Sequence, residues 1–197
     1  SREAGRNLIR VNKDAFVVGY IGHVKQERLP DSFLEYLNDF AEESATEAVI
    51  ITKDCAGREL DRFENITVLE QSLSPSEKAD VFAAADVWVF PYDFANPERP
   101  PVIDPPLTVL EAMSAGRPVV VSNTLTIPEY VIDEETGILV EPGNHEEIIN
   151  SLTKFRNGLL DRTSIGANAQ RYVRDSFDAE TVSSALQDVY STVTNSS

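Results

Sequence analysis

The residues between 105 and 123 have the types and spacing of an anion-binding helix followed by a buried strand. Pro106 suits the start of a helix, where the N–H that proline lacks has no helical partner. Gly116 stands where a helix ends in the left-handed conformation, and the apolar run 119–121 is typical of a strand covered on both faces. Glu111 lies near the start of this predicted helix. A helix start attracts anions and a nearby carboxylate accepts hydrogen bonds from hydroxyls, so the pattern is typical of sugar-nucleotide binding.

A second group of polar residues follows the first predicted strand. Gly22 allows a sharp turn and a close approach of a ligand to the backbone, and His23, Lys25 and Arg28 come directly after it. Basic side chains at this edge of a parallel sheet would suit a diphosphate through charge-assisted hydrogen bonds. The alternative is a solvated loop whose charges pair with neighbouring acids, Glu27 and Asp31, and the residues alone leave it open.

Other polar residues are weaker candidates. Asp93, Glu98 and Asp104 lie in a proline-rich loop ahead of the anion-binding helix, and loops at the carboxyl end of a strand commonly carry function. Glu129 could reach the same edge or could belong to a surface helix cap. His145 follows Asn144, which is a typical helix cap. His145 also lies far from His23 in the sequence, and no third ligand is spaced to join them, so we expect no metal site.

Composition excludes several classes of protein. The 197 residues carry 33 acidic against 17 basic side chains, a net charge of −16, which argues against a nucleic-acid partner and against contact with anionic lipid. The chain contains no apolar run long enough for a membrane span and no signal peptide at its start. Its single cysteine, Cys55, fits a reducing compartment better than a disulfide framework. These features predict a cytoplasmic protein, with Cys55 as a packing or loop residue.

Apolar runs typical of strands alternate with helical patterns through most of the chain. This alternation predicts an α/β fold with a doubly wound, Rossmann-like parallel sheet and further helices at the C-terminus. We expect a polar linker remnant over 1–14, one nucleotide-sugar-binding domain over 15–175 and a C-terminal helix over 176–197. The predicted strands are 15–21, 48–52, 66–69, 87–90, 119–121 and 138–140, and the predicted helices are 31–43, 57–63, 74–84, 106–115, 144–155, 163–175 and 178–193.

Six blocks in order resemble one known family. They are Tyr20 to Arg28, Asn65 to Leu69, Ala83 to Pro91, Leu110 to Val120 (LEAMSAGRPVV), Ile127 to Glu129, and Thr136 to Asn144. The chain resembles the C-terminal, donor-binding half of a retaining glycosyltransferase with two Rossmann-like domains (GT-B), in glycosyltransferase group 1 or family 4. The resemblance implies metal-independent transfer of a sugar from a nucleotide-diphosphate sugar, no cofactor, and an N-terminal acceptor domain outside this chain.

The resemblance also implies roles for individual residues. Glu111 corresponds to the glutamate that holds the ribose hydroxyls, and Arg28 to the basic residue on the donor diphosphate. The backbone N–H groups of Leu107 and Thr108, and the Thr108 hydroxyl, would meet phosphate or sugar. With the loop residues above, the expected donor-binding set is Gly22, His23, Lys25, Arg28, Leu107, Thr108 and Glu111.

The chain departs from the family pattern at several positions. Ile103 stands where the family has its first glutamate, with Asp104 one position away as the candidate catalytic residue, and His23 stands where it has an arginine. Pro105 and Pro106 remove two amide donors. These departures leave two alternatives open: a degenerate module of the same fold used for assembly, and another GT-B enzyme such as a sugar-nucleotide epimerase.

Overall fold

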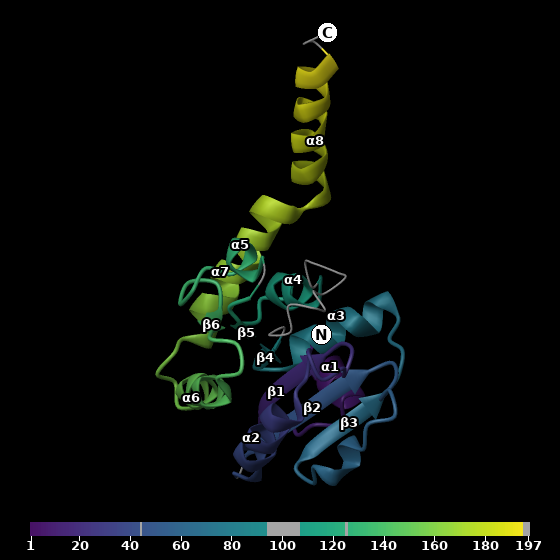
Figure 1. Cartoon of the computed structure of the whole chain (residues 1–197), viewed down its shortest axis with the longest axis vertical. Coiled ribbons are helices and arrows are strands. Elements are labelled where there is room, and N and C mark those ends of the chain that lie inside the picture. Colours follow the sequence, from purple (N-terminus) through teal and green to yellow (C-terminus); the bar gives the residue numbers. More distant parts are fainter. Residues whose placement is uncertain (44, 94–106, 125, 195–197) are drawn as a thin grey trace.

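The structure, a computed structural model, describes residues 1–43, 45–93, 107–124 and 126–194. Its centre is a sheet of six parallel strands in the order β3-β2-β1-β4-β5-β6 (Figure 1). The central strands are buried on both faces, as their apolar runs predict. The predicted α/β, doubly wound class is therefore confirmed. The strands are β1 (Phe16–Ile21), β2 (Thr46–Thr52), β3 (Ile66–Glu70), β4 (Val87–Phe90), β5 (Val119–Ser122) and β6 (Ile138–Val140).

Helices cover the sheet in two layers. In one layer α2 packs against α6 and the strands beneath them, and in the other α1 packs against α3, α3 against α4, and α4 against α7. The 57–63 segment forms only a short 3-10 turn, η1 (Leu60–Arg62). The helices are α1 (Arg2–Leu8), α2 (Asp31–Glu42), α3 (Pro75–Ala84), α4 (Leu107–Ser114), α5 (Ile127–Tyr130), α6 (His145–Arg156), α7 (Arg162–Phe177) and α8 (Ala179–Thr194).

The helix ends show which local predictions are right. Ser74 and Glu77 form the reciprocal capping box at the start of α3, Asn144 caps α6, and Gly116 ends α4 with φ +70°. Helix α2 lacks a side-chain cap. Pro30 is its cap residue, and Asp31, which has the residue type of a cap, is already helical, with its carboxylate engaged by Arg58 and by the Gln26 amide.

The N-terminal segment is folded onto the domain. Where the sequence predicts a polar linker, α1 packs along α3, and Arg6 in it is only 4% exposed. Gly5 lets the two helices approach so closely that a Cβ at this position would lie 1.9 Å from the carbonyl oxygen of Asp80. Residues 2–8 are thus part of the packed structure, while the boundary drawn at residue 14 stays a prediction.

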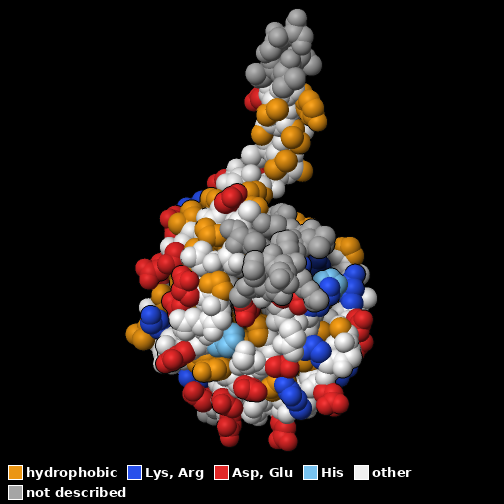
Figure 2. Space-filling view, in the orientation of Figure 1, with side chains coloured by type: hydrophobic (Ala, Val, Ile, Leu, Met, Phe, Trp, Pro, Cys, Tyr) orange, Lys and Arg blue, Asp and Glu red, His pale blue; other side chains and the backbone are white. Residues whose placement is uncertain are grey.

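Helix α8 projects away from the rest of the molecule (Figure 1). One of its faces carries exposed apolar side chains, which are visible along the projecting helix in Figure 2: Val182, Leu186, Val189 and Tyr190. Their spacing is that of one helical face. Across the described ranges, no helix combines the length and the apolar character that a membrane span requires.

Candidate functional site

The strand order reverses direction between β1 and β4, which are neighbours in the sheet but not in sequence. In open parallel sheets, ligands bind at the carboxyl ends of the strands beside such a point. The backbone joins the two sides here, since the N–H of Asp93, after β4, donates to the carbonyl of Glu27 at 2.9 Å. The loop that follows β1 and the segment that follows β4 therefore form one continuous rim.

The loop after β1 is held in shape by side chains from other elements. The Tyr20 hydroxyl donates to the carbonyl of His23 at 2.5 Å. Arg58, which lies between β2 and η1, donates to the carbonyls of Leu29, at 2.7 Å, and of Val24. These bonds fix both ends of the segment that carries Lys25 and Arg28.

Gly22 makes this turn possible. Its φ of +150° is strained for residues with a side chain, and an added Cβ would lie 3.3 Å from the Tyr20 hydroxyl oxygen. The glycine that the sequence places at the end of the first strand is therefore required by the backbone itself.

Arg28 acts on the two buried tyrosines at this rim. Burial, and then the neighbouring Tyr92, raise the pKa of Tyr20 well above its ordinary value, while the charges of Arg28 and Arg58 oppose the rise. Burial likewise raises the pKa of Tyr92 to about 12, against a hydrogen bond with Thr108 and the charge of Arg28. The positive charge of Arg28 thus acts on both phenols.

Thr108 connects this rim to the start of α4. Its side chain bonds to Tyr92, which is 2% exposed, so the first turn of α4 is anchored at the carboxyl end of β4. The first N–H groups of any α-helix have no partner within the helix, and they carry its positive partial charge. Leu107, the first residue of α4, is 65% exposed, so this helix start is open to solvent on that side.

Glu111 lies one turn further along α4 and faces Lys78 of α3. Its Oε1 accepts a hydrogen bond from Lys78 Nζ at 2.6 Å, and both side chains are about one-third exposed. Its Oε2 is buried and has no hydrogen-bond partner within the described part of the chain. A buried acceptor without a donor is unfavourable, so this oxygen has unused hydrogen-bonding capacity.

The structure brings together only part of the predicted set. Gly22 and Arg28 lie on the loop after β1, and Thr108 bonds to Tyr92 at the end of β4. Glu111 lies one turn further along α4 beside Lys78, whereas His23 and Lys25 are exposed on the loop after β1. The predicted pairing of this loop's bases with Asp31 is not what the structure shows, because Asp31 binds Arg58 and Arg62 instead.

Several candidates fall elsewhere. Glu98, Ile103, Asp104, Pro105 and Pro106 lie outside the described residues, so the catalytic candidate Asp104 stays a prediction. Glu129 is exposed at the start of α5, and its carbonyl accepts a hydrogen bond from Tyr172.

Three residues at the rim were not expected from the sequence. Tyr92 could have been suspected, because it directly follows a buried strand at the edge where ligands bind. Lys78 carries no such signal, since only the packing of α3 against α4 places it beside Glu111. Arg58 lies in a loop distant in sequence from the carbonyls that it binds.

Comparison with known proteins agrees with this fold. Residues 15–157 match the family described as Glycosyl transferases group 1. Sulfoquinovosyl transferase from Arabidopsis thaliana is 34% identical over 98 residues, which are 48% of this chain and 17% of that protein. HepE from Anabaena, crystallised with UDP, superposes with a TM-score of 0.79 at 18% identity over 98% of this chain and 53% of its own.

The C-terminal domain of the glycosyl transferase group 1 family protein LpcC from Francisella tularensis has a TM-score of 0.71 at 19% identity, covering 91% of this chain and 94% of its own. The chain therefore spans about half the length of HepE and less of the curated relatives, but nearly all of the isolated LpcC domain. By the family match over most of its length, the chain belongs to the glycosyl transferases group 1.

Proposed function

We propose that the chain is the donor-binding half of a retaining, family 4 glycosyltransferase, which moves a sugar from a nucleotide-diphosphate sugar to an acceptor hydroxyl. The observation that carries the proposal is the rim between β1 and β4. There the loop that holds Arg28 and the helix α4 that holds Glu111 are far apart in sequence but are joined by hydrogen bonds to the segment after β4. Chains of this family share that topology, and the neighbour HepE was crystallised with UDP.

In this proposal the donor diphosphate binds between Arg28 and the first turn of α4. The guanidinium and the helix start both favour negative charge, and that charge increases on the diphosphate as the sugar leaves. Tyr20 and Tyr92 are neutral near pH 7, as phenols with an ordinary pKa of about 10 already are, and burial raises the pKa of each further. Their hydroxyls therefore add no opposing charge. Neutralisation by side chains and helix amides would remove the need for a metal ion.

Glu111 would bind the ribose. Lys78 holds one carboxylate oxygen and orients the group, which leaves the other oxygen to accept a ribose hydroxyl. Binding of this kind positions the donor, and positioning together with charge stabilisation is what this half can contribute to the reaction.

The acceptor site would belong to an N-terminal half that precedes this domain. Two observations support that division: the chain corresponds to half of HepE and to an isolated C-terminal domain of LpcC. The apolar face of α8 would be covered by that other half, because an exposed stripe of four large apolar side chains is unusual on a solvated helix. Alone, this chain would bind nucleotide diphosphate weakly and transfer no sugar, and we propose a cytoplasmic site of action.

Calorimetric titration of the chain with UDP, GDP and ADP tests the donor site. We expect at least one of the three to bind, and Glu111→Gln to weaken it by about ten- to a hundredfold, the usual effect of losing a hydrogen bond to a charged group. Glu35→Gln, which removes an exposed acid from α2, is the matched control and should bind as the unmodified chain does. If none of the three nucleotides binds, the degenerate-module alternative is favoured instead.

A further inference from the structure

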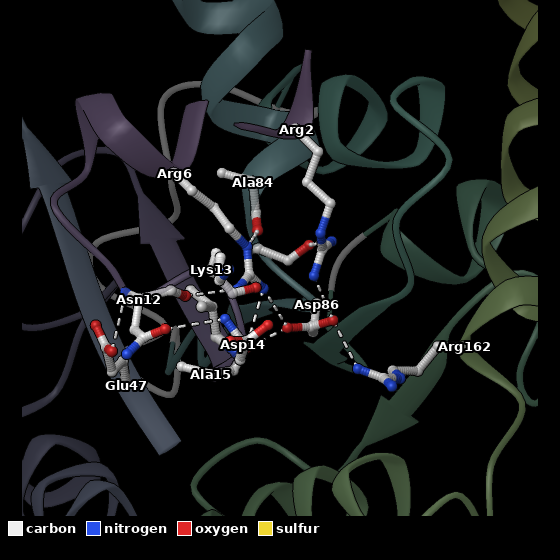
Figure 3. A network of polar contacts seen from close by, with 12 residues as sticks. Arg2, Arg6, Asn12, Lys13, Asp14, Ala15, Glu47, Ala84, Asp86 and Arg162 are labelled. Atoms are coloured by element: carbon white, nitrogen blue, oxygen red, sulfur yellow. Dashed lines mark hydrogen bonds and ion pairs between the residues drawn. The ribbon is translucent and has the colours of Figure 1, made fainter. Parts of the chain in front are cut away.

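The opposite edge of the sheet, where the strands begin, carries a cluster of arginines around one carboxylate. Asp86 directly precedes β4, and its side chain is almost fully buried. Arg2 and Arg6 reach it from α1, and Arg162 reaches it from the start of α7 (Figure 3). Arg117, just ahead of β5, lies at the same edge. Segments from three regions of the sequence thus bring four arginines together around this carboxylate.

Asp86 is saturated by these contacts. Its Oδ1 accepts from Arg2 at 2.8 Å and from Arg162 at 2.6 Å, and its Oδ2 accepts from Arg6 at 2.8 Å. Oδ2 also accepts the backbone N–H of Val17 at 2.9 Å. No acceptor capacity is left on this carboxylate for a further arginine.

Arg6 has a clear structural role. Besides Asp86, its guanidinium donates to four backbone carbonyls, those of Asn12, Lys13, Ala15 and Ala84. The remaining three arginines differ, because they line an open pocket of about 440 Å³ together with Thr163 and Gln170.

Arg117 is the arginine of this cluster that has no ion-pair partner among the described residues. Within the described residues its guanidinium forms no ion pair, and its Nε is buried without a hydrogen-bond partner. Burial, and then the charge of Arg2, lower the pKa of Arg117, so its environment disfavours the charge that it carries. A partly buried guanidinium among other guanidiniums is unfavourable unless an anion accompanies it.

The local charge is opposite to that of the whole molecule. One carboxylate faces four guanidiniums, an excess of three positive charges, in a chain whose net charge is −16. Two neighbouring acids are engaged elsewhere: Asp161 caps α7 through Thr163 and Ser164, and Glu47 accepts the N–H of Asn12. A purely structural ion pair for Asp86 needs one or two arginines, so the cluster exceeds what the fold requires.

We propose that this pocket is a second binding site, for a small polyanion of the diphosphate type, held by Arg117 and Arg162 with Arg2 at its border. Guanidinium groups bind phosphate oxygens in pairs through parallel N–H bonds, and the Thr163 hydroxyl and Gln170 amide at the same wall offer further polar contacts. The site lies at the edge of the sheet opposite to the proposed donor rim, so an occupant would act from outside the transfer site.

The test is a nuclear magnetic resonance titration of the full chain with inorganic pyrophosphate, repeated with inorganic phosphate. We expect pyrophosphate to shift the amide signals of Gly116, Arg117 and Thr163, more strongly than phosphate does, and increased salt to weaken the binding. Arg117→Gln should weaken it by about tenfold or more, and Arg117→Lys should recover part of the loss. Since Arg117 makes no bond to Asp86, neither change removes a contact of the folded core.

Two controls separate this site from others. Arg171→Gln removes an exposed arginine from the same helix, α7, outside the pocket, and should leave pyrophosphate binding unchanged. Arg28→Gln removes the proposed donor contact and should leave the signals of Gly116 and Thr163 responsive. Three results would each overturn the proposal: chemical-shift changes confined to Gly22 and its neighbours, an equal loss of pyrophosphate affinity in Arg117→Gln and Arg171→Gln, or no chemical-shift change at all. None of these results depends on nucleotide binding.

Discussion

Replacing Gly5 by alanine distinguishes a packed α1 from a linker. In a solvated helix this change stabilises, because alanine is favoured over glycine by about 1 kcal/mol. In the structure, however, the new Cβ would lie 1.9 Å from the carbonyl oxygen of Asp80 and 3.0 Å from the Cβ of Ala84. The two descriptions of this segment therefore predict opposite signs for the change in stability.

The magnitude follows from the packing. To reach normal contact distance the Asp80 carbonyl and α1 must separate by more than about 1 Å. Both belong to helices, so the movement is shared by α1 and α3 and displaces Arg6 from its partners around Asp86. Overpacking of this kind costs about 1–3 kcal/mol, and the displaced contacts of Arg6 add to that cost. After a helix-propensity gain of about 0.5–1 kcal/mol we expect a net loss of about 1–2 kcal/mol in the free energy of unfolding.

Urea denaturation, followed by circular dichroism, measures this loss, and a thermal scan should show a melting temperature lower by about 2–8 °C. Asn7→Ala is the matched control, because Asn7 is exposed on the same helix and its replacement adds helix propensity without a clash. A Gly5→Ala protein as stable as Asn7→Ala, or more stable than the unmodified chain, would refute the packing of α1 on α3. It would also remove Arg2 and Arg6 from the arginine cluster.

Two further predictions concern titrating groups. Burial, followed by the hydrogen bond and charge of Glu70, raises the pKa of Cys55 from 9.0 to about 11. We therefore expect the Cys55 thiol to react with a maleimide at pH 8 roughly a hundredfold more slowly than an unperturbed thiol. Reaction at the ordinary rate would contradict its packed position. Burial lowers the pKa of His145 below its ordinary 6.5, so the unfolded chain binds more protons and stability should fall as the pH drops below about 6.5. His145→Gln should reduce the fall in melting temperature between pH 7.5 and pH 5.5. His23→Gln, at an exposed position, should leave that fall unchanged.

Most of the sheet could be predicted because the signals are local. The apolar runs of β4 and β5 and the left-handed Gly116 each depend on a few adjacent residues, and both appear as predicted. The capping box of Ser74 and Glu77, at the start of the helix predicted over 74–84, is equally local. Pro30 shows the limit of such signals. Asp31 has the residue type of a helix cap, but its carboxylate is drawn away by Arg58, which lies 27 positions further along the chain.

Only the backbone positions of the candidate site could be predicted from the sequence. A glycine at the end of β1 and a helix start after β4 follow from topology, so Gly22 and Thr108 could be placed without coordinates. The partners of those residues could not. Lys78 meets Glu111, and Tyr92 meets Thr108, through packing between elements, and no local pattern records which side chain a neighbouring helix presents.

The fold itself accounts for part of the excess positive charge of the arginine cluster, and the rest of that charge has no structural partner in the described part of the chain. Helices that cross a parallel sheet end near its amino edge, and each helix end carries about half a negative charge. Arg6 and Arg2 donate to the carbonyls of Ala84 and Ala85 at the end of α3, so they satisfy this end directly. The ends of α3 and α4 together offset about one positive charge, which is less than the excess of three around Asp86. Within the described residues, the buried Nε of Arg117 donates to neither helix end, so the remaining charge is centred where an added diphosphate would bind. Arg117→Gln should therefore reduce pyrophosphate binding without reducing stability.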